Sequence, residues 1–143
     1  MSVNRRNHEM YPDPTAYEVL AKMDREEKKI RARPLVYICS PFSGEVERNT
    51  QNARRYSRFA ALRGYIPITP HLLFPQFLDD NKPAERDLGL LFGDALMDRC
   101  AEVWVFGARV SSGMAGEIER AKQLRYRIRY FTDRCEERKE ALV

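Results

Sequence analysis

The stretch EVWVFGARVSSGMAGEIERA, residues Glu102 to Ala121, decides the fold that we expect for this chain. A short apolar run ends at Phe106, and a loop of glycine, serine and arginine follows it. Met114, Ile118 and Ala121 then recur at the i, i+4 and i+7 positions of one helix face. The pattern predicts a strand, a polar loop and a helix whose unpaired first amides can bind an anion. The loop residues at the helix start are Ser111, Ser112 and Gly113.

Glu117 is the unusual residue of that helix. At roughly 100° per residue, it lies on the flank of the apolar face, whereas Glu119 points nearly the opposite way. A carboxylate on the packing side of a helix needs a partner or a chemical role, because burying an unpaired charge is costly. Two interpretations stay open: Glu117 caps its own helix or pairs with an arginine, or it is a functional carboxylate in a cleft.

The composition is that of a globular chain. The 143 residues are enough for one domain with a buried core, and 32% of them are charged while 43% are hydrophobic. No run of about 18 apolar residues occurs, and the first residues, MSVNRRNH, are too polar for a signal peptide. We therefore expect a cytoplasmic protein without a membrane partner.

Cysteine spacing and net charge exclude several further classes. Cys39, Cys100 and Cys135 are odd in number and far apart, so we expect neither a disulfide framework nor a zinc site. We expect no other metal and no cofactor either. The net charge of +4 suits nucleotides or nucleic acid, but the basic residues alternate with acids along the helices. The arginine-rich helix over residues 46–63 has no aromatic platform beside it, so a small phosphate-bearing molecule is favoured over nucleic acid.

Two regions are expected: an N-terminal helical extension over residues 1–33 and one α/β domain over residues 34–143. In the extension, Thr15 and Glu18 have the spacing of a capping box. The apolar stripe that follows predicts an amphipathic helix that packs on the domain or on a second subunit. The stripe consists of Ala16, Val19, Leu20 and Met23.

The domain alternates strands and helices. The continuous apolar run Leu35 to Cys39 is typical of a strand buried on both faces, and Pro67 favours an edge position for the strand over residues 65–69. Alternation predicts a further strand around residues 126–130, before a short charged helix over residues 133–143. The pattern predicts a three-layer, Rossmann- or flavodoxin-like parallel sheet of four to five strands with helices on both faces, plus the N-terminal helix.

The helix expected over residues 84–99 carries an acidic edge. Asp87, Asp94 and Asp98 line up beside the expected core stripe of this helix and repel each other unless a cation faces them. Arg86 and Arg99 are the cations that a merely solvated edge would use. The expected core stripe is Leu88, Leu91, Phe92 and Ala95.

Ligands of parallel sheets bind at the carboxyl ends of the strands. Three loops, residues 40–44, 69–73 and 107–113, lie at that end, and we expect one pocket to hold them together with Glu117 and Asp94. The apolar segment over residues 70–80 is either a wall of this pocket or a subunit contact. Its His71 is either a ligand-binding residue or a satisfied structural group.

Three motifs resemble the nucleoside 2-deoxyribosyltransferase superfamily, which includes the deoxynucleoside monophosphate N-glycosidases. They are residues 36–40, residues 94–106 and residues 111–117, and the likeness covers roughly residues 34–131. Residues 70–77 and 104–107 look like an uncharacterised branch of small bacterial and phage proteins beside that superfamily.

The resemblance assigns roles to individual residues. It implies that Glu117 is the nucleophile, that Asp94 holds the sugar or the base, and that Tyr37 lies beside the nucleophile. It also implies that Ser111 binds a 5'-phosphate. With the loops added, the residues expected to bind substrate are Ser40, Pro41, Phe42, Ser43, Gly44, His71, Asp98, Ser111, Ser112, Gly113 and Met114.

The implied activity is that of an N-glycosidase or (deoxy)ribosyltransferase for a nucleoside or nucleoside 5'-monophosphate. Glu117 would attack the anomeric carbon, and Asp94 or Asp98 would steer or protonate the departing base. Water as acceptor gives hydrolysis, and a second base gives transfer. The rival interpretation is a non-catalytic sensor of a nucleotide or ADP-ribose-like ligand. We also expect a homo-oligomer, a dimer or higher.

Overall fold

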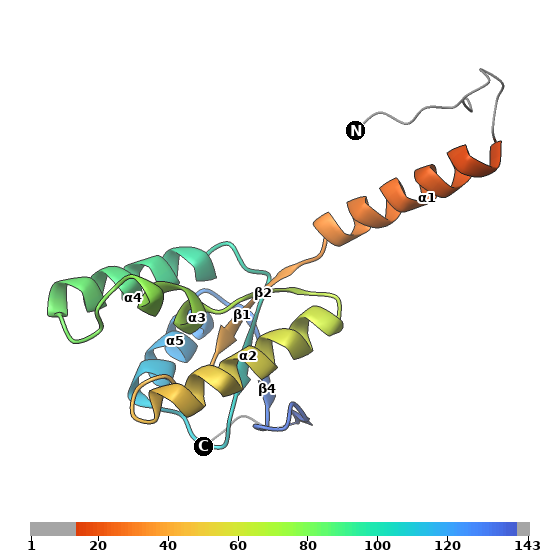
Figure 1. The fold of residues 1–143 in the computed structure, drawn as a ribbon. Helices are drawn as coiled ribbons and strands as arrows, with labels where there is room; N and C mark the ends of the chain where they lie inside the picture. Colours follow the sequence, from red (N-terminus) through yellow and green to blue (C-terminus); the bar gives the residue numbers. More distant parts are fainter. Residues whose placement is uncertain (1–13, 140–143) are drawn as a thin grey trace. The chain divides into compact units, whose positions relative to one another are not determined.

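The computed structural model describes residues 14–139 (Figure 1). The chain divides into two compact units, Met1–Arg33 and Pro34–Val143. The described part of the first unit, residues 14–33, consists mainly of the helix α1 (Pro14–Arg31), which includes Thr15 and Glu18. Ion pairs such as Arg31–Glu27, 2.6 Å apart, run along its surface, and its apolar residues Val19, Leu20 and Met23 are exposed.

The second unit is built on a five-stranded sheet in the order β2-β1-β3-β4-β5. Its first four strands are parallel: β2 (Ile66–Ile68), β1 (Leu35–Cys39), β3 (Glu102–Phe106) and β4 (Arg127–Phe131). The last, β5 (Glu137–Arg138), is antiparallel to β4. The mostly parallel α/β fold that the sequence predicts is confirmed, including the edge position of the strand that contains Pro67.

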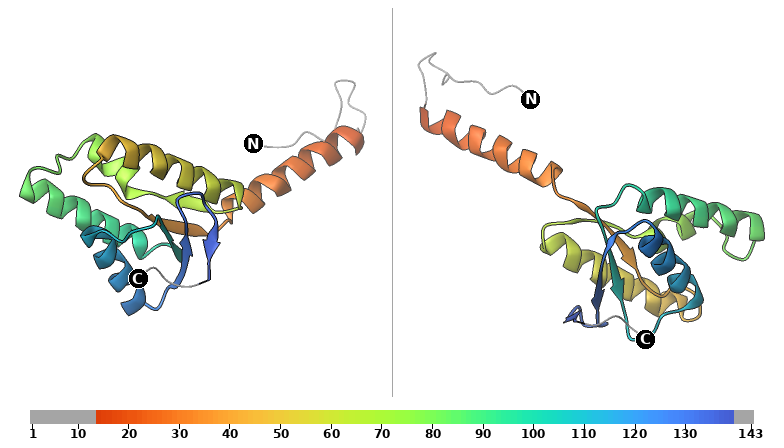
Figure 2. Two further views of the ribbon diagram at one scale, coloured as in Figure 1. Left: turned by 90° about the horizontal axis from the view of Figure 1, so that it is seen from below. Right: turned by 180° about the vertical axis from the view of Figure 1, so that it is seen from behind.

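Helices cover both faces of the sheet, so the unit has three layers (Figure 2). On one face, α2 (Val46–Leu62) buries Tyr56 and Ala60 against an aromatic cluster that includes Trp104 and Phe106. On the other face, Met97 of α4 (Pro83–Met97) and Met114 of α5 (Ser112–Gln123) pack on the sheet. Residues of β1 and β3 enter both clusters, because neighbouring side chains of a strand point to opposite faces.

Two short helical turns follow the edge strand β2. They are α3 (Pro70–Leu73) and the 3₁₀ turn η1 (Phe74–Gln76). Pro70 is tolerated at the first position of α3, whereas Pro75 lacks the amide donor that a continuing helix would need. Within residues 14–139, no helix is long and apolar enough to cross a membrane.

The predicted core stripe of α4 is wrong. Leu88, Leu91 and Phe92 have exposed fractions of 41%, 64% and 37%, and Ala95 is exposed as well. The helix instead buries Gly93 and Met97. At Gly93 a Cβ atom would lie only 3.3 Å from the Tyr37 hydroxyl, so glycine allows α4 to approach the sheet closely.

The predicted terminal helix is also wrong over the described residues. After β4 the chain turns at Thr132, whose Oγ1 accepts hydrogen bonds from the amides of Arg134 and Glu136. Glu137 then accepts two hydrogen bonds from Arg129 across the β4–β5 pair, at 2.7 and 2.8 Å. This cross-strand ion pair favours a short strand over a helix. Residues 140–143 lie outside the described residues.

Candidate active site

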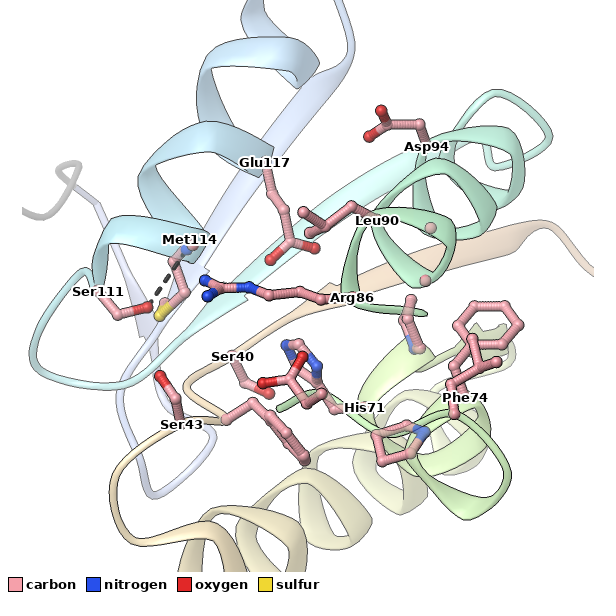
Figure 3. Close-up of a pocket in the computed structure, with 18 of the residues that line it drawn as sticks. Ser40, Ser43, His71, Phe74, Arg86, Leu90, Asp94, Ser111, Met114 and Glu117 are labelled. Carbon is pink, nitrogen blue, oxygen red and sulfur yellow. Dashed lines mark hydrogen bonds between the residues drawn. The ribbon is translucent and has the colours of Figure 1, made fainter. Parts of the chain in front are cut away.

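A cavity of about 150 Å³ opens where the parallel strands β1, β2 and β3 end (Figure 3). Its walls are the loop after β1, the turns α3 and η1 after β2, the start of α5, and α4. Most of the residues expected to form the site line it: Tyr37, Ser40, Phe42, Ser43, His71, Asp94, Ser111, Ser112, Gly113, Met114 and Glu117.

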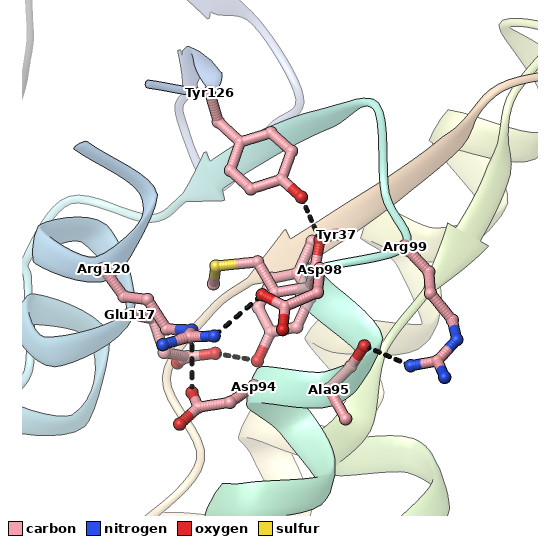
Figure 4. A network of polar contacts seen from close by, with 9 residues as sticks. Tyr37, Asp94, Ala95, Asp98, Arg99, Glu117, Arg120 and Tyr126 are labelled. Atoms are coloured by element: carbon pink, nitrogen blue, oxygen red, sulfur yellow. Dashed lines mark hydrogen bonds and ion pairs between the residues drawn. The ribbon is translucent and has the colours of Figure 1, made fainter. Parts of the chain in front are cut away.

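Glu117 is held in this cavity by two residues of β1. Tyr37 donates its hydroxyl hydrogen to Oε2 of Glu117 (Figure 4), and Cys39 Sγ lies 3.8 Å from Oε1. Tyr37 and Cys39 are two residues apart, so their side chains leave the strand on the same face. The two donors reach Glu117 because the parallel pairing of β1 with β3 places α5 above that face.

The structural alternatives for Glu117 do not occur in the described part of the chain. The start of α5 is capped by Ser111, whose Oγ accepts a hydrogen bond from the Met114 amide at 3.3 Å. No arginine or lysine between residues 14 and 139 lies within ion-pair distance of Glu117. Glu117 is thus neither a helix cap nor half of a salt bridge there.

The surroundings of Glu117 raise its pKa to about 7. Withdrawal of the carboxylate from water is the main cause, and the nearby charge of Asp94 adds to it. The hydrogen bonds from Tyr37 and Cys39 act in the opposite direction. Burial and the Glu117 charge raise the pKa values of Tyr37 and Cys39 in turn, so both groups keep their protons and remain donors.

Two residues of the acidic edge, Asp94 and Asp98, pair with Arg120 of α5 (Figure 4). Arg120 Nη2 lies 2.7 Å from Asp98 Oδ1, and its Nε lies 3.5 Å from Asp94 Oδ1. The alternative in which Arg86 or Arg99 pairs with Asp98 does not occur, because Arg120 takes that place and Arg99 donates to the Ala95 carbonyl oxygen. Only the tertiary packing of α5 beside α4 brings Arg120 to this edge.

Three residues that were expected to bind substrate do not line the cavity. Asp98 is turned toward Arg120, and Pro41 lies against Gly107, where a Cβ atom would be 3.8 Å from its Cδ. Gly44, with φ of 95°, lines a neighbouring hollow instead. Each is close to a lining residue in the chain, but its side chain or backbone faces elsewhere.

His71 forms part of the cavity wall. Its ring stacks on Phe42 with centroids 4.9 Å apart and planes 17° from parallel. Burial lowers the pKa of His71, although a hydrogen bond with the Ser40 backbone opposes the shift. The imidazole is therefore mainly neutral at pH 7, and it serves as a flat wall beside Phe42.

Two polar groups of the cavity have no partner in the described residues. Ser40 is only 1% exposed, and its Oγ has no hydrogen bond. Arg86 reaches into the cavity from α4 (Figure 3) and makes no side-chain hydrogen bond or ion pair with residues 14–139. Sequence reasoning missed Arg86 as a site residue.

A sequence signal for Arg86 exists. It shares the i, i+4, i+7 and i+11 spacing with Leu90, Gly93 and Met97, which is a single helix face. That face competes with the more apolar stripe of α4, which is exposed. Gly93 adds no hydrophobic side chain to the face that contains Arg86. Hydrophobic periodicity therefore selects the stripe of Leu88, Leu91 and Phe92 as the buried face, although that stripe is exposed.

Among the described residues, no group of three or more histidine, cysteine, aspartate or glutamate side chains is arranged to hold a metal ion. The fold and the cavity together define a Rossmann-like α/β protein with a carboxylate held at the ends of parallel strands.

The chain belongs to the family described as Domain of unknown function (DUF7768), which matches residues 34–131. The match includes β1 to β4 and every residue that lines the cavity. No curated protein matches the chain. The description of the family names no activity.

Proposed function

We propose that this protein is a cytoplasmic N-glycoside hydrolase or (deoxy)ribosyltransferase that acts on a nucleoside or nucleoside 5'-monophosphate. The observation that carries the proposal is the position of Glu117. Its carboxylate lies in the cavity wall, contacted at both oxygens by neutral donors, Tyr37 and Cys39, and is not neutralised by a basic residue in the described chain. Once it is ionised, a carboxylate held this way has its negative charge available for a developing cation.

The chemistry follows from that charge. As the bond between the sugar and the base breaks, positive charge develops at the anomeric carbon, and the Glu117 carboxylate forms an ester there. Asp94, which lines the same cavity and pairs with Arg120, is a hydrogen-bond acceptor for hydroxyl or N–H groups of the substrate. Attack of water on the ester then completes hydrolysis, whereas attack of a second base completes transfer.

The flat walls suit the base. Phe42, Phe74 and Pro75 line the cavity, and Phe42 already stacks on His71. Aromatic and proline rings are suitable surfaces for a planar base. The start of α5 adds polar groups, Ser111 and Ser112, to the same lining, so a ligand with both an apolar and a polar part fits it.

The test is a panel of ribo- and 2-deoxyribonucleosides and their 5'-monophosphates, with base release followed by HPLC. A second run with an added free base detects transfer as a new nucleoside peak. The proposal requires base release from at least one compound of the panel. Tight binding of a nucleotide without any base release would instead identify a non-catalytic ligand-binding protein.

Replacing Tyr37 with phenylalanine is expected to move the pH dependence of catalysis. The Tyr37 hydrogen bond lowers the pKa of Glu117, so its loss raises that pKa further. Because a nucleophilic carboxylate must be ionised, the rising limb of kcat/KM shifts to higher pH. At pH 6 the rate should fall about tenfold or more, the scale of a hydrogen bond to a charged group.

The matched control for that variant is Tyr126→Phe. Tyr126 donates to the Met97 carbonyl oxygen at 2.6 Å, away from Glu117, so its loss should leave the midpoint unchanged. A carboxyl ¹³C NMR titration of Glu117 follows the same shift without any substrate. An unaltered Glu117 midpoint in Tyr37→Phe would contradict the prediction.

We also propose that the chain forms a homo-oligomer through the exposed apolar face of α4. Leu88, Leu91 and Phe92 are large side chains exposed together on one helix, which is unusual for a surface that stays in water. Leu91→Glu should shift the protein toward monomer in size-exclusion chromatography with light scattering. Leu124→Glu, at an exposed leucine outside α4, is the control; a monomeric wild type would refute the proposal.

A further inference from the structure

Arg86 is the cationic group of the cavity whose charge is not compensated by a neighbour in the described chain. Two acidic residues of the cavity form ion pairs with other basic residues: Asp94 pairs with Arg120 at 3.5 Å, and Glu85 pairs with Lys82 at 3.7 Å. Glu117 is held by Tyr37 and Cys39, while Asp80 is exposed at the rim. A guanidinium in a cavity without a carboxylate partner is suited to an anionic ligand.

The direction of Arg86 identifies where that anion would lie. Figure 3 shows the side chain extending from α4 across the cavity toward the side that carries Ser40, Ser43 and Ser111. This side also contains the first turn of the twelve-residue helix α5, with the amides of Ser112 and Gly113. Helix-start amides and a guanidinium therefore face the same part of the cavity.

Ser40 provides an independent observation. Its side chain lines the cavity and is almost fully buried, yet Oγ has no hydrogen-bond partner between residues 14 and 139. A buried hydroxyl without a partner carries a desolvation cost that a ligand oxygen would remove. Ser111 adds a second hydroxyl: its oxygen accepts from the Met114 amide, which leaves its own hydrogen free to donate.

We infer that Arg86 selects a substrate that carries a phosphate monoester, which it binds together with the Ser40 hydroxyl and the start of α5. This inference rests on the proposed function and names its substrate class: nucleoside 5'-monophosphates rather than nucleosides. The planar guanidinium can donate two parallel hydrogen bonds to phosphate oxygens. A bound phosphate would also link α4 to α5 across the cavity and hold the sugar next to Glu117.

The test uses two probes that differ only in the phosphate, 2-deoxyribose 5-phosphate and 2-deoxyribose. Binding is measured by isothermal titration calorimetry on the Glu117→Gln chain, so that turnover does not interfere. The phosphorylated sugar should bind at least about tenfold more tightly. Arg86→Met should remove that preference without changing the affinity for 2-deoxyribose, and Arg86→Lys should restore part of it.

Arg99→Met is the matched control, because Arg99 lies just beyond the C-terminal end of α4 and is also exposed, but its guanidinium contacts the Ala95 carbonyl oxygen. It should leave both affinities unchanged. Arg86 is exposed and makes no side-chain contact that folding needs, so its variants should keep the wild-type Tm. Circular dichroism on each variant checks this.

The inference is overturned if the two sugars bind equally, if 2-deoxyribose 5-phosphate does not bind, or if Arg86→Met keeps the preference. These results are separable from failure of the proposed function. Base release from nucleosides without a phosphate preference would retain the glycosidase proposal and overturn this inference. A phosphate preference that depends on Arg86, without base release from any nucleotide, would retain this inference and overturn the glycosidase proposal.

Discussion

Replacing Glu117 with glutamine is expected to abolish base release, with kcat lowered by at least about a thousandfold. Glutamine has nearly the shape of glutamate, and its amide can still contact Tyr37 and Cys39 in the cavity wall. It cannot form the ester with the anomeric carbon or compensate the positive charge of the transition state. The measurement is single-turnover base release under saturating substrate, which separates chemistry from binding.

Glu119→Gln is the matched control for this variant. Glu119 lies on the same helix two residues away, but its side chain is exposed and it does not line the cavity. Its replacement should leave kcat within about twofold of the wild-type value. If Glu117→Gln kept more than a few per cent of the wild-type rate, Glu117 would not be the nucleophile and the proposed mechanism would fail.

The same variant is expected to be more stable than the wild type at neutral pH. The pKa of Glu117 is about 7 in the folded chain, against 4.5 for an unperturbed glutamate. The folded state therefore binds more protons than the unfolded state between these two values, and the wild type loses stability as pH rises through this window. Linkage puts the loss at up to about 3 kcal/mol, complete once the pH exceeds 7.

Glutamine does not ionise, so this loss is absent from Glu117→Gln. The stability difference between the variant and the wild type should be small near pH 4, grow from about pH 4.5 to 7, and stay constant above that. Urea unfolding followed by circular dichroism at a series of pH values measures the curve, with Glu119→Gln as control. If the stability difference between Glu117→Gln and the wild type did not change with pH, folding would not perturb the pKa of Glu117.

The two expectations for Glu117 belong together. A carboxylate that reduces stability at neutral pH is a cost that a catalytic role can offset. Glu117 lines the same cavity as Asp94 and Tyr37, where its charge can act on a substrate. The stability measurement requires no substrate. It therefore tests the perturbed carboxylate even before the reaction partner is identified.

Local patterns were sufficient for the layers of the fold. The continuous apolar run of β1 predicts a central parallel strand, Pro67 predicts an edge, and the spacing of Met114, Ile118 and Ala121 predicts the buried face of α5. These signals are strong because each depends on the burial of one short element. The helix expected after β4 failed because its decisive contact, Arg129 with Glu137, depends on a hairpin that charge composition does not reveal.

The site could also be predicted from the sequence only in part. Glu117 stands out because it is a charge beside a buried helix face, and its loop lies at the end of the sheet where ligands bind. The pairing of Asp94 and Asp98 with Arg120 was not accessible, since these residues are on different helices. Arg86 was missed because an apolar stripe on the same helix has the stronger pattern.

The amino-acid sequence by itself determined the alternation of strands and helices, the strand ends where a ligand would bind, and Glu117 as the residue that needs explanation. Each of these depends on periodicity and on the cost of burying charge, which are local properties. Only the tertiary structure decided that Cys39 joins Tyr37 in holding Glu117, that Arg120 pairs with Asp94 and Asp98, and that Arg86 faces the cavity. The rotation of α4 decides the last of these, and it follows from the close approach that Gly93 allows against Tyr37.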